Sequence, residues 1–310
     1  MFKILYIQPI HPDGMNYLRA KSNYDVVVAS GTDQETLKKE IVDADVIVSR
    51  LTTINSELMA CAKHLKAVCK HGVGVDNIDV AYCQEHHIAV LTTGDANSST
   101  VAEQAMLAIG ALFRRTFWLD HRLREGDWSS RDHSNAADLM GRTVGLIGYG
   151  RIGKCLARMA SKGFLMNVCI FDPYANRGDV EADGYKWYDR LEDMLPVIDV
   201  LSPHVPLTES TRGMIGENEL KLMKSGSMLV NFARGGVVDE KALYEQLASG
   251  HLCGAAIDVF EQEPPIVQGN PLFDLENVIL SPHCGTFTED SRSRMSMRLA
   301  TEIERVLEQT

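Results

Sequence analysis

The chain has 310 residues, of which 45% are apolar and 24% charged, values typical of a globular protein that can bury a core without disulfides or metals. The formal net charge of −11 and the absence of a long basic run argue against a broad nucleic-acid surface, although a small anion could still bind a locally positive pocket. No apolar run is long enough to span a bilayer. The seven cysteines are odd in number and form no C-x-x-C pair, so we expect a reducing compartment and a cytoplasmic protein.

Short apolar segments alternate with helix-like segments over the first third of the chain, which predicts one parallel α/β unit of about a hundred residues. The apolar N-terminus is too short for a signal peptide and indicates a first strand. The expected strands are Lys3–Ile7, Asp25–Ala29, Asp45–Ser49, Leu65–Cys69 and Ile88–Leu91. Helices are expected between them, including Thr32–Val42 and Asn55–Ala62.

A polar, turn-rich stretch, Thr92–Ser99, indicates a linker. Thr100 and Glu103 have the spacing of a capping box and predict the start of an apolar helix, Val101–Phe113. The polar and aromatic segment Trp118–Leu139 looks irregular, and it is either an arm that packs on a second subunit or a solvated loop.

A second α/β unit begins at Gly141 and ends with a helix over Asp290–Leu307, after which we expect no further domain. Its expected strands are Thr143–Ile147, Asn167–Phe171, Val200–Ser202, Ser227–Asn231, Ala255–Val259 and Val278–Leu280.

The first strand of this second unit leads into Gly148-Tyr149-Gly150-Arg151-Ile152-Gly153, and a helix, Lys154–Lys162, follows. Glycines at these spacings allow a tight turn, close approach to a pyrophosphate and packing of helix on strand. The next strand ends at Asp172, where a carboxylate can accept hydrogen bonds from ribose hydroxyls and would repel the 2′-phosphate of NADP. The unit therefore predicts bound NAD, with contacts from Gly148, Gly150, Arg151, Ile152, Gly153 and Asp172.

Three later segments carry side chains suited to acid–base chemistry at the ends of predicted strands, where ligands of open α/β sheets bind. Arg234 could hold a carboxylate in bidentate fashion, and its alternative is a surface arginine in a turn. Asp258 and Glu263 are candidate site carboxylates, although the Glu263 segment alone also fits a solvated acidic turn. His283 suits proton transfer near neutral pH, or is a structural histidine.

These segments, together with Gly72–Asp79, resemble the D-isomer-specific 2-hydroxyacid dehydrogenase family along essentially the whole chain. The resemblance implies two Rossmann-like or flavodoxin-like α/β domains with parallel sheets and an inter-domain cleft. Residues 1–98 plus 286–310 would form a substrate-binding domain and residues 99–285 an NAD-binding Rossmann domain. It also implies a homodimer through the nucleotide domain, with the arm near residues 118–139.

The resemblance also implies residue roles in hydride transfer between NAD and a small anionic 2-hydroxy acid. His283 would exchange the proton at the substrate oxygen, Glu263 would favour the protonated imidazole, and Arg234 would bind the substrate carboxylate and the reacting carbonyl. The backbone at Gly72, Val73 and Gly74 would hold the carboxylate from the far side. Further cofactor contacts are expected from Asp258, at the nicotinamide amide, and from Val205, Phe232, Ala233 and Gly285.

Within the family, Arg50 and the Gly72–Asp79 segment most resemble 3-phosphoglycerate dehydrogenases. That resemblance implies that Arg50 would contact a distal phosphate of the substrate. The alternative is that Arg50 is simply an arginine at the end of a strand. Lys70-His71 departs from the small residue often found before that glycine, so glyoxylate or hydroxypyruvate reduction stays open. A non-catalytic NAD sensor or corepressor on the same fold is an alternative of another class.

Two other chemistries have weak support in the sequence. The cluster Glu85-His86-His87 lacks a spaced pair of helical ligands, so no metal site is expected. Cys284 has no separate base to activate it as a nucleophile.

Overall fold

The computed structural model describes residues 1–309, and the chain divides into two compact α/β units, each built on a parallel sheet. Unit 1 consists of Met1–Asn97 together with residues 286–309, and unit 2 consists of Ser98–Gly285. The boundary after Asn97 lies one residue before the expected one. Within residues 1–309, no helix combines the length and apolar composition that a membrane crossing requires.

The sheet of unit 1 has five parallel strands in the order β2-β1-β3-β4-β5. This is the flavodoxin-like order, in which the chain direction across the sheet reverses between β1 and β3. Buried apolar runs such as Val46–Ser49 are typical of strands covered on both faces. The strands are β1 (Phe2–Tyr6), β2 (Tyr24–Val28), β3 (Val46–Ser49), β4 (Ala67–Lys70) and β5 (Ala89–Thr92).

Helices cover both faces of this sheet because successive strand residues point to opposite sides. Ile4 packs in a cluster with α1 and α12, whereas its neighbour Leu5 packs in a second cluster with α2, α3 and α4. Side chains such as Asp33, Asn55 and Asp79 cap these helices by accepting a backbone N–H of the first turn. The helices are α1 (Pro12–Arg19), α2 (Gln34–Glu40), α3 (Ser56–Met59), α4 (Val80–Glu85) and α12 (Glu289–Glu308).

The sheet of unit 2 has seven parallel strands in the order β12-β11-β10-β9-β6-β7-β8. The order reverses between β6 and β9, which is the position where doubly wound folds bind dinucleotides. The strands are β6 (Thr143–Ile147), β7 (Asn167–Phe171), β8 (Lys186–Trp187), β9 (Val200–Pro203), β10 (Ser227–Asn231), β11 (Leu252–Ile257) and β12 (Val278–Leu280).

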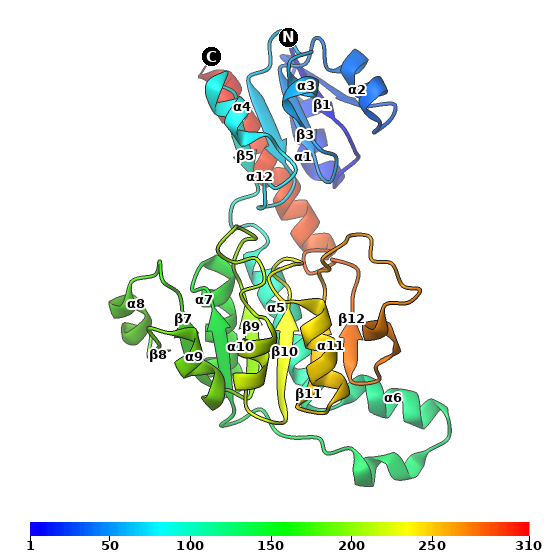
Figure 1. Ribbon diagram of the computed structural model, residues 1–310. Helices are drawn as coiled ribbons and strands as arrows, with labels where there is room; N and C mark the ends of the chain where they lie inside the picture. Colours follow the sequence, from blue (N-terminus) through cyan, green and yellow to red (C-terminus); the bar gives the residue numbers. More distant parts are fainter. Residues whose placement is uncertain (310) are drawn as a thin grey trace. The chain divides into compact units, whose positions relative to one another are not determined.

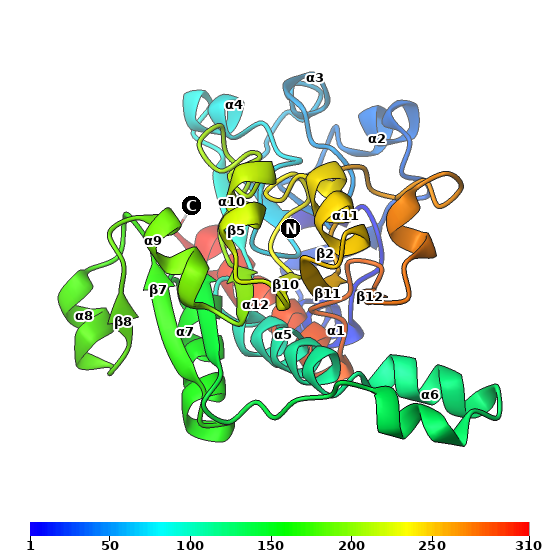
Figure 2. The same cartoon turned by 60° about the horizontal axis from the view of Figure 1, so that its bottom comes forward.

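In unit 2, α5 and α7 pack on one face of the sheet and α9, α10 and α11 on the other (Figures 1 and 2). The helices are α5 (Ser98–Phe113), α6 (Thr116–Arg124), α7 (Arg151–Arg158, continued by a π-helical turn Met159–Gly163), α8 (Arg177–Ala182), α9 (Leu191–Met194), α10 (Glu217–Leu222) and α11 (Glu240–Ala248). Short 3₁₀ helices lie at Trp128–His133, Leu195–Val197 and Pro271–Asp274.

The segment after α5 is more ordered than its sequence predicted. It forms α6 and the 3₁₀ helix Trp128–His133, and both extend away from the seven-stranded sheet (Figure 2). None of the α6 residues is buried, so the apolar periodicity that reveals most helices is missing here. Polar contacts replace it: Arg124 pairs with Asp120 one turn earlier, and Arg115 lies 4.6 Å from the ring centre of Trp118.

Two smaller expectations also fail. The capping box at Thr100 is wrong, because α5 already begins at Ser98 and Thr100 is buried in its first turn. The two-residue strand β8 went unpredicted because so short an edge strand carries no readable periodicity.

Candidate functional site

A histidine–carboxylate pair lies beyond the carboxyl ends of β11 and β12 in unit 2. His283 Nδ1 is 2.7 Å from Glu263 Oε2, and both side chains are partly exposed. Because Nδ1 is engaged by the carboxylate, Nε2 is the ring nitrogen left to face a ligand. His283 has the left-handed backbone (φ 49°) that few non-glycine residues adopt, and its N–H donates to Asp258 O at 2.7 Å.

Glu263 is held as a charged acceptor for this histidine. Its Oε1 accepts the backbone N–H of Phe260 at 3.1 Å, while Oε2 faces His283. Burial raises the pKa of Glu263, but the hydrogen bond and charge of His283, the Phe260 N–H and the charge of Arg234 outweigh it. The net pKa is therefore below its usual value, and the carboxylate is ionised at neutral pH.

Asp258 organises the loop that carries His283. Its carboxylate is 2% exposed and accepts Ser281 Oγ–H, Cys284 N–H at 2.9 Å and Gly285 N–H at 2.9 Å. A buried carboxylate needs such donors to offset its lost hydration. Asp258 thus fixes the backbone on both sides of His283, a role that the sequence did not indicate for it.

Arg234 follows β10, in the loop beside the Glu263 segment. Its guanidinium Nη1 donates to Ala233 O at 2.7 Å, and Asn231 Nδ2 donates to Arg234 O at 3.2 Å. The next residue must be small, because a Cβ on Gly235 would overlap the carbonyl of Phe260. The loops after β10 and β11 can therefore approach closely, and the charge of Arg234 reaches Glu263.

The Gly-rich turn after β6 has the geometry of a pyrophosphate cradle. Gly148 has φ 96°, and a Cβ there would lie 2.7 Å from His204 O, at the reversal between β6 and β9. A Cβ on Gly153 would overlap Gly148 O, so this glycine lets α7 pack against the turn. Nothing lies within 4 Å of the equivalent position on Gly150, which leaves the backbone open to a ligand. The residues present fit a dinucleotide, whose phosphates would meet the free N–H groups at the start of α7.

Asp172 is held in place at the end of β7. Its two carboxylate oxygens accept the backbone N–H groups of Tyr149 at 2.7 Å and Tyr174 at 2.8 Å. The Tyr149 hydroxyl in turn donates to Asp183 Oδ2 at 2.6 Å, just after α8. Burial, followed by the bond and charge of Asp183, raises the pKa of Tyr149, so the hydroxyl stays a donor. Sequence reasoning missed Tyr149 because the residue between the first two glycines has no fixed role in the pattern.

The other expected cofactor residues lie around these two loops of unit 2. Arg151 and Ile152 are the first residues of α7. Val205 Cγ1 would be 3.1 Å from a Cβ on Gly148. A Cβ on Gly285 would lie 3.2 Å from Asp258 Oδ2 and 3.4 Å from Phe232 Cδ1, and Ala233 N–H donates to Asn231 Oδ1 at 3.1 Å.

The expected substrate residues of unit 1 lie at the carboxyl edge of its own sheet. Arg50 follows β3, and its backbone N–H donates to Gln8 Oε1 at 3.2 Å, which places it where the strand order reverses. Gly72 has φ 152°, a value that favours glycine, and its carbonyl accepts the N–H of Thr93 at 3.0 Å. Val73 is 43% exposed.

The structure gives no support to the metal or thiolate alternatives. Burial, followed by the charge of Asp258, raises the pKa of Cys284, which disfavours the nucleophilic thiolate. His86 caps α4 and stacks on Tyr82, as expected for the end of a helix. Across residues 1–309 no three His, Cys, Asp or Glu side chains are grouped to hold a metal ion.

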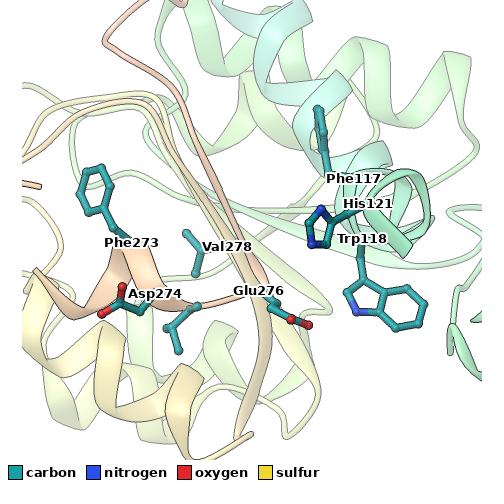
Figure 3. A pocket seen from close by; sticks show the side chains of 8 residues that line it. Phe117, Trp118, His121, Phe273, Asp274, Glu276 and Val278 are labelled. Atoms are coloured by element: carbon teal, nitrogen blue, oxygen red, sulfur yellow. The ribbon is translucent and has the colours of Figure 1, made fainter. Parts of the chain in front are cut away.

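A separate hollow of about 280 Å³ lies between α6 and the segment that leads into β12 (Figure 3). Phe117, Trp118 and His121 line it from α6, and Phe273, Glu276 and Val278 line it from the other side. It contains none of the residues of the His283 cluster.

The match to a family model decides the identity of unit 2. Residues 106–285 match the model described as "D-isomer specific 2-hydroxyacid dehydrogenase, NAD binding domain". The chain belongs to this family. The matched residues include the Gly-rich turn, Asp172 and the His283 cluster, and they form the family's NAD-binding domain.

Individual relatives agree on the family and differ in their named substrates. The chain is 40% identical over 308 residues to the D-3-phosphoglycerate dehydrogenase of Methanocaldococcus jannaschii, covering 99% of this chain and 58% of that protein. It is 41% identical to the glyoxylate reductase of Korarchaeum cryptofilum, covering 87% and 82%. The D-lactate dehydrogenase of Aquifex aeolicus, solved with NAD and lactic acid, superposes with a TM-score of 0.88 at 28% identity, covering 99% and 96%. The chain thus spans little more than half the length of the phosphoglycerate dehydrogenases it matches.

Proposed function

We propose that the protein is an NAD-dependent oxidoreductase that interconverts a D-2-hydroxy acid and its 2-keto acid. The observation that carries this proposal is the 2.7 Å contact between His283 Nδ1 and Glu263 Oε2, with Arg234 close enough for its charge to act on the same carboxylate. A proton donor and a cation for a carboxylate are the two protein groups that reduction of a 2-keto acid requires.

The chemistry follows from these side chains. When bound, NADH supplies the hydride that C2 of the keto acid accepts. Protonated His283 donates its Nε2 proton to the substrate oxygen as that oxygen gains negative charge, which leaves a neutral imidazole and a hydroxy acid. Glu263 holds Nδ1 and so orients the ring for the transfer. Arg234 binds the substrate carboxylate and polarises the carbonyl; in the oxidation direction His283 accepts the hydroxyl proton instead.

Asp172 supports NAD over NADP. Its carboxylate is fixed by two backbone N–H groups and presents negative charge where the 2′-phosphate of NADP would have to bind. One solved relative, from Sinorhizobium meliloti, is named an NADPH-dependent glyoxylate/hydroxypyruvate reductase, so the cofactor differs among proteins of this fold.

The best-supported substrate pair is 3-phosphoglycerate and 3-phosphohydroxypyruvate. Arg50 lies at the reversal point of the unit 1 sheet and pairs with no carboxylate of residues 1–309, so its charge is available to a distal phosphate. The second candidate is reduction of glyoxylate or hydroxypyruvate, which is favoured by relatives of similar identity that carry those names.

The experiment that tests the proposal is NADH oxidation by the full chain with a panel of keto acids: 3-phosphohydroxypyruvate, hydroxypyruvate, glyoxylate, pyruvate and bulkier homologues. We expect turnover with at least one small 2-keto acid, and the highest kcat/KM with 3-phosphohydroxypyruvate. A preference for glyoxylate would reject the phosphorylated substrate and keep the reaction class. NADH binding without turnover on any member would favour a non-catalytic NAD sensor or corepressor.

The proposal includes a homodimer formed by unit 2. The side chains of Phe117, Leu123, Trp128 and Met140 are each more than half exposed along α6 and the segment after it, and apolar side chains exposed together mark interaction surfaces. Light scattering should give twice the chain mass, and Phe117→Ser together with Trp128→Ser should halve it. A monomeric wild-type chain would refute the dimer.

The seven free cysteines further support a reducing, cytoplasmic location.

A further inference from the structure

Two glutamates outside the His283 cluster join the loops that carry Arg234 and Glu263. Glu240 is the first residue of α11, and Glu261 lies in the segment after β11, two residues before Glu263. Glu240 N–H donates to Glu261 Oε1 at 3.1 Å, and Glu261 N–H donates in return to Glu240 Oε1. This reciprocal pair of hydrogen bonds, the Glu240–Glu261 clamp, connects the two loops that supply the proposed site side chains.

Both backbone N–H groups of the clamp need an acceptor from outside their own element. Glu240 lies in the first turn of α11, where N–H groups find no carbonyl within the helix. The side chain of Asp239 serves another of these groups, at Ala242. Glu261 belongs to an irregular segment, and its N–H finds its acceptor in the Glu240 carboxylate. Each glutamate therefore holds the backbone of the other loop.

The clamp brings like charges together. Burial raises the pKa of Glu240 most, and the charges of Glu261, Asp239 and Glu263 raise it further, which outweighs the opposite effect of the Glu261 N–H. Carboxylates at close range repel each other, so this arrangement costs free energy in the folded protein. Natural proteins accept such local conflicts mainly at functional sites, which favours a requirement for position over one for stability.

The clamp also holds the residue that binds Glu263. Phe260 directly precedes Glu261, and its N–H donates to Glu263 Oε1 at 3.1 Å. The buried Phe260 ring stacks on Phe273, with 5.8 Å between the ring centres. A Cβ on Gly235, in the loop after β10, would overlap the Phe260 carbonyl. Displacement of Glu261 would therefore draw the Phe260 N–H away from Glu263 and open the contact between the two loops.

We propose that Glu240 and Glu261 are positioning residues that fix the place of Glu263 by clamping its loop to the start of α11. Because Glu263 in turn orients His283, the clamp acts on proton transfer from outside the site. This inference rests on the proposed function for its effect on turnover. Neither side chain of the clamp has to touch the substrate or NAD.

Removal of either carboxylate tests the clamp by activity. Glu240→Ala and Glu261→Ala should each lower kcat for the preferred 2-keto acid about 10-fold, with the KM for NADH within about twofold. The double variant should lose little more than either single one, because each change breaks the same clamp. Glu240→Gln, whose carbonyl can still accept the Glu261 N–H, should recover most of the loss. Glu245→Ala, at an exposed position of α11, is the matched control and should keep wild-type kcat.

The ionisation of Glu263 tests the clamp without turnover. The Phe260 N–H helps to hold the pKa of Glu263 below its usual value, and carbon-13 NMR of the glutamate carboxyls, assigned with Glu263→Gln, can follow it in the full chain. Glu240→Ala should raise this pKa as the Phe260 bond weakens. Glu240→Gln removes the same charge but keeps the acceptor, so it should leave the pKa low or lower it. A downward shift in both variants would show a charge effect alone and reject the clamp.

These readouts separate the clamp from the proposed function. Opposite shifts of the Glu263 pKa in a chain that reduces no keto acid would keep the clamp and reject the enzyme. Turnover with wild-type kcat in Glu240→Ala and Glu261→Ala would reject the clamp and keep the enzyme, even if the melting temperature fell, since the bonds would then only stabilise the start of α11. If Glu240→Ala unfolds, as circular dichroism would reveal, Glu261→Ala and Glu261→Gln, at an exposed position, carry the same comparison.

Discussion

The two units use the same edge of a parallel sheet in opposite ways. In unit 2, the polar side chains around His283 are bonded to one another: Glu263 to His283, and Asp258 to the loop around it. In unit 1, His71, Thr93 and Asn97 are buried near the ends of β4 and β5, and each has a polar atom without a partner among residues 1–309. The side chains of the His283 cluster are therefore paired with one another, whereas the edge of unit 1 keeps hydrogen-bonding capacity for a ligand; in unit 2, His204 Nδ1 after β9 is likewise buried without a partner among residues 1–309.

This difference separates reaction from selection. Substitutions in the bonded network of unit 2 should lower turnover of every substrate, because they alter groups that act on the atoms common to all 2-keto acids. Substitutions at the edge of unit 1 should distinguish one acid from another. Each of the following variants tests one side of that division.

His283→Asn should have the largest effect, because it removes the only proton donor proposed for the substrate oxygen. We expect kcat to fall about 1,000-fold for all substrates, within the usual range for general acid–base groups. NADH affinity, followed by fluorescence titration, should be unchanged. Wild-type turnover in this variant would exclude His283 from proton transfer.

Glu263→Gln should lower kcat about 100-fold, and the loss should depend on pH. The pKa of Glu263 lies below its usual value, so the wild-type carboxylate is ionised at neutral pH and becomes protonated only in acid. The variant should consequently lose more activity at pH 7, where the wild type has this charge, than at pH 4, where the carboxyl begins to be neutral. An equal loss at both values in a full pH–rate profile would indicate a purely structural role.

Arg50→Ala tests unit 1. The KM for 3-phosphohydroxypyruvate should rise about 30-fold, because a charge-assisted contact to phosphate is lost, while the KM for glyoxylate stays constant. Arg305→Ala, at an exposed position of α12, is the control. Equal effects on both substrates would remove the distinction between the two edges.

Asp172→Ala should change the cofactor ratio. Loss of the carboxylate should reduce the preference for NADH over NADPH about tenfold, through a weaker ribose contact and weaker repulsion of the 2′-phosphate. The measurement is kcat/KM with each cofactor, and Asp193→Ala on α9 is an exposed acidic control.

Tyr149→Phe should have the smallest effect. It removes the hydrogen bond to Asp183 while keeping the ring, its edge contact with Tyr185 and the backbone N–H that holds Asp172. The KM for NADH should rise about threefold with kcat unchanged. Tyr174→Phe, whose side chain is 88% exposed, should leave both constants as they are.

Most of the strands were predictable because strands of a buried parallel sheet appear in the sequence as short runs of apolar residues. Four strands match their expected bounds, namely Thr143–Ile147, Asn167–Phe171, Ser227–Asn231 and Val278–Leu280, and the other expected strands shift by one to three residues at one or both ends. α6 escaped prediction because a helix with no buried residue has no apolar face to reveal it. Its stability comes from polar and cation–π contacts, which leave little periodic signal in the sequence.

The candidate site divides in the same way. Motif spacing indicated His283, Glu263 and Arg234, and the structure brings the first two into contact in unit 2. Motif spacing could not reveal that Asp258 accepts hydrogen bonds from the His283 loop or that the Tyr149 hydroxyl donates to Asp183. Both interactions depend on turns whose partners are distant in sequence. The isolation of His71 Nε2 also required coordinates, since a missing hydrogen bond has no sequence pattern.

The position of α12 has a consequence for the order in which the chain folds. Leu299, Ala300 and Ile303 of this helix pack against Ile4 and Tyr6 of β1, so the core of unit 1 joins the two most distant parts of the described chain. During synthesis, at about 5–20 residues per second, unit 2 can close its sheet before Ile303 emerges. β1 is therefore made long before α12, and the face of β1 that carries Ile4 and Tyr6 stays incompletely covered until α12 emerges.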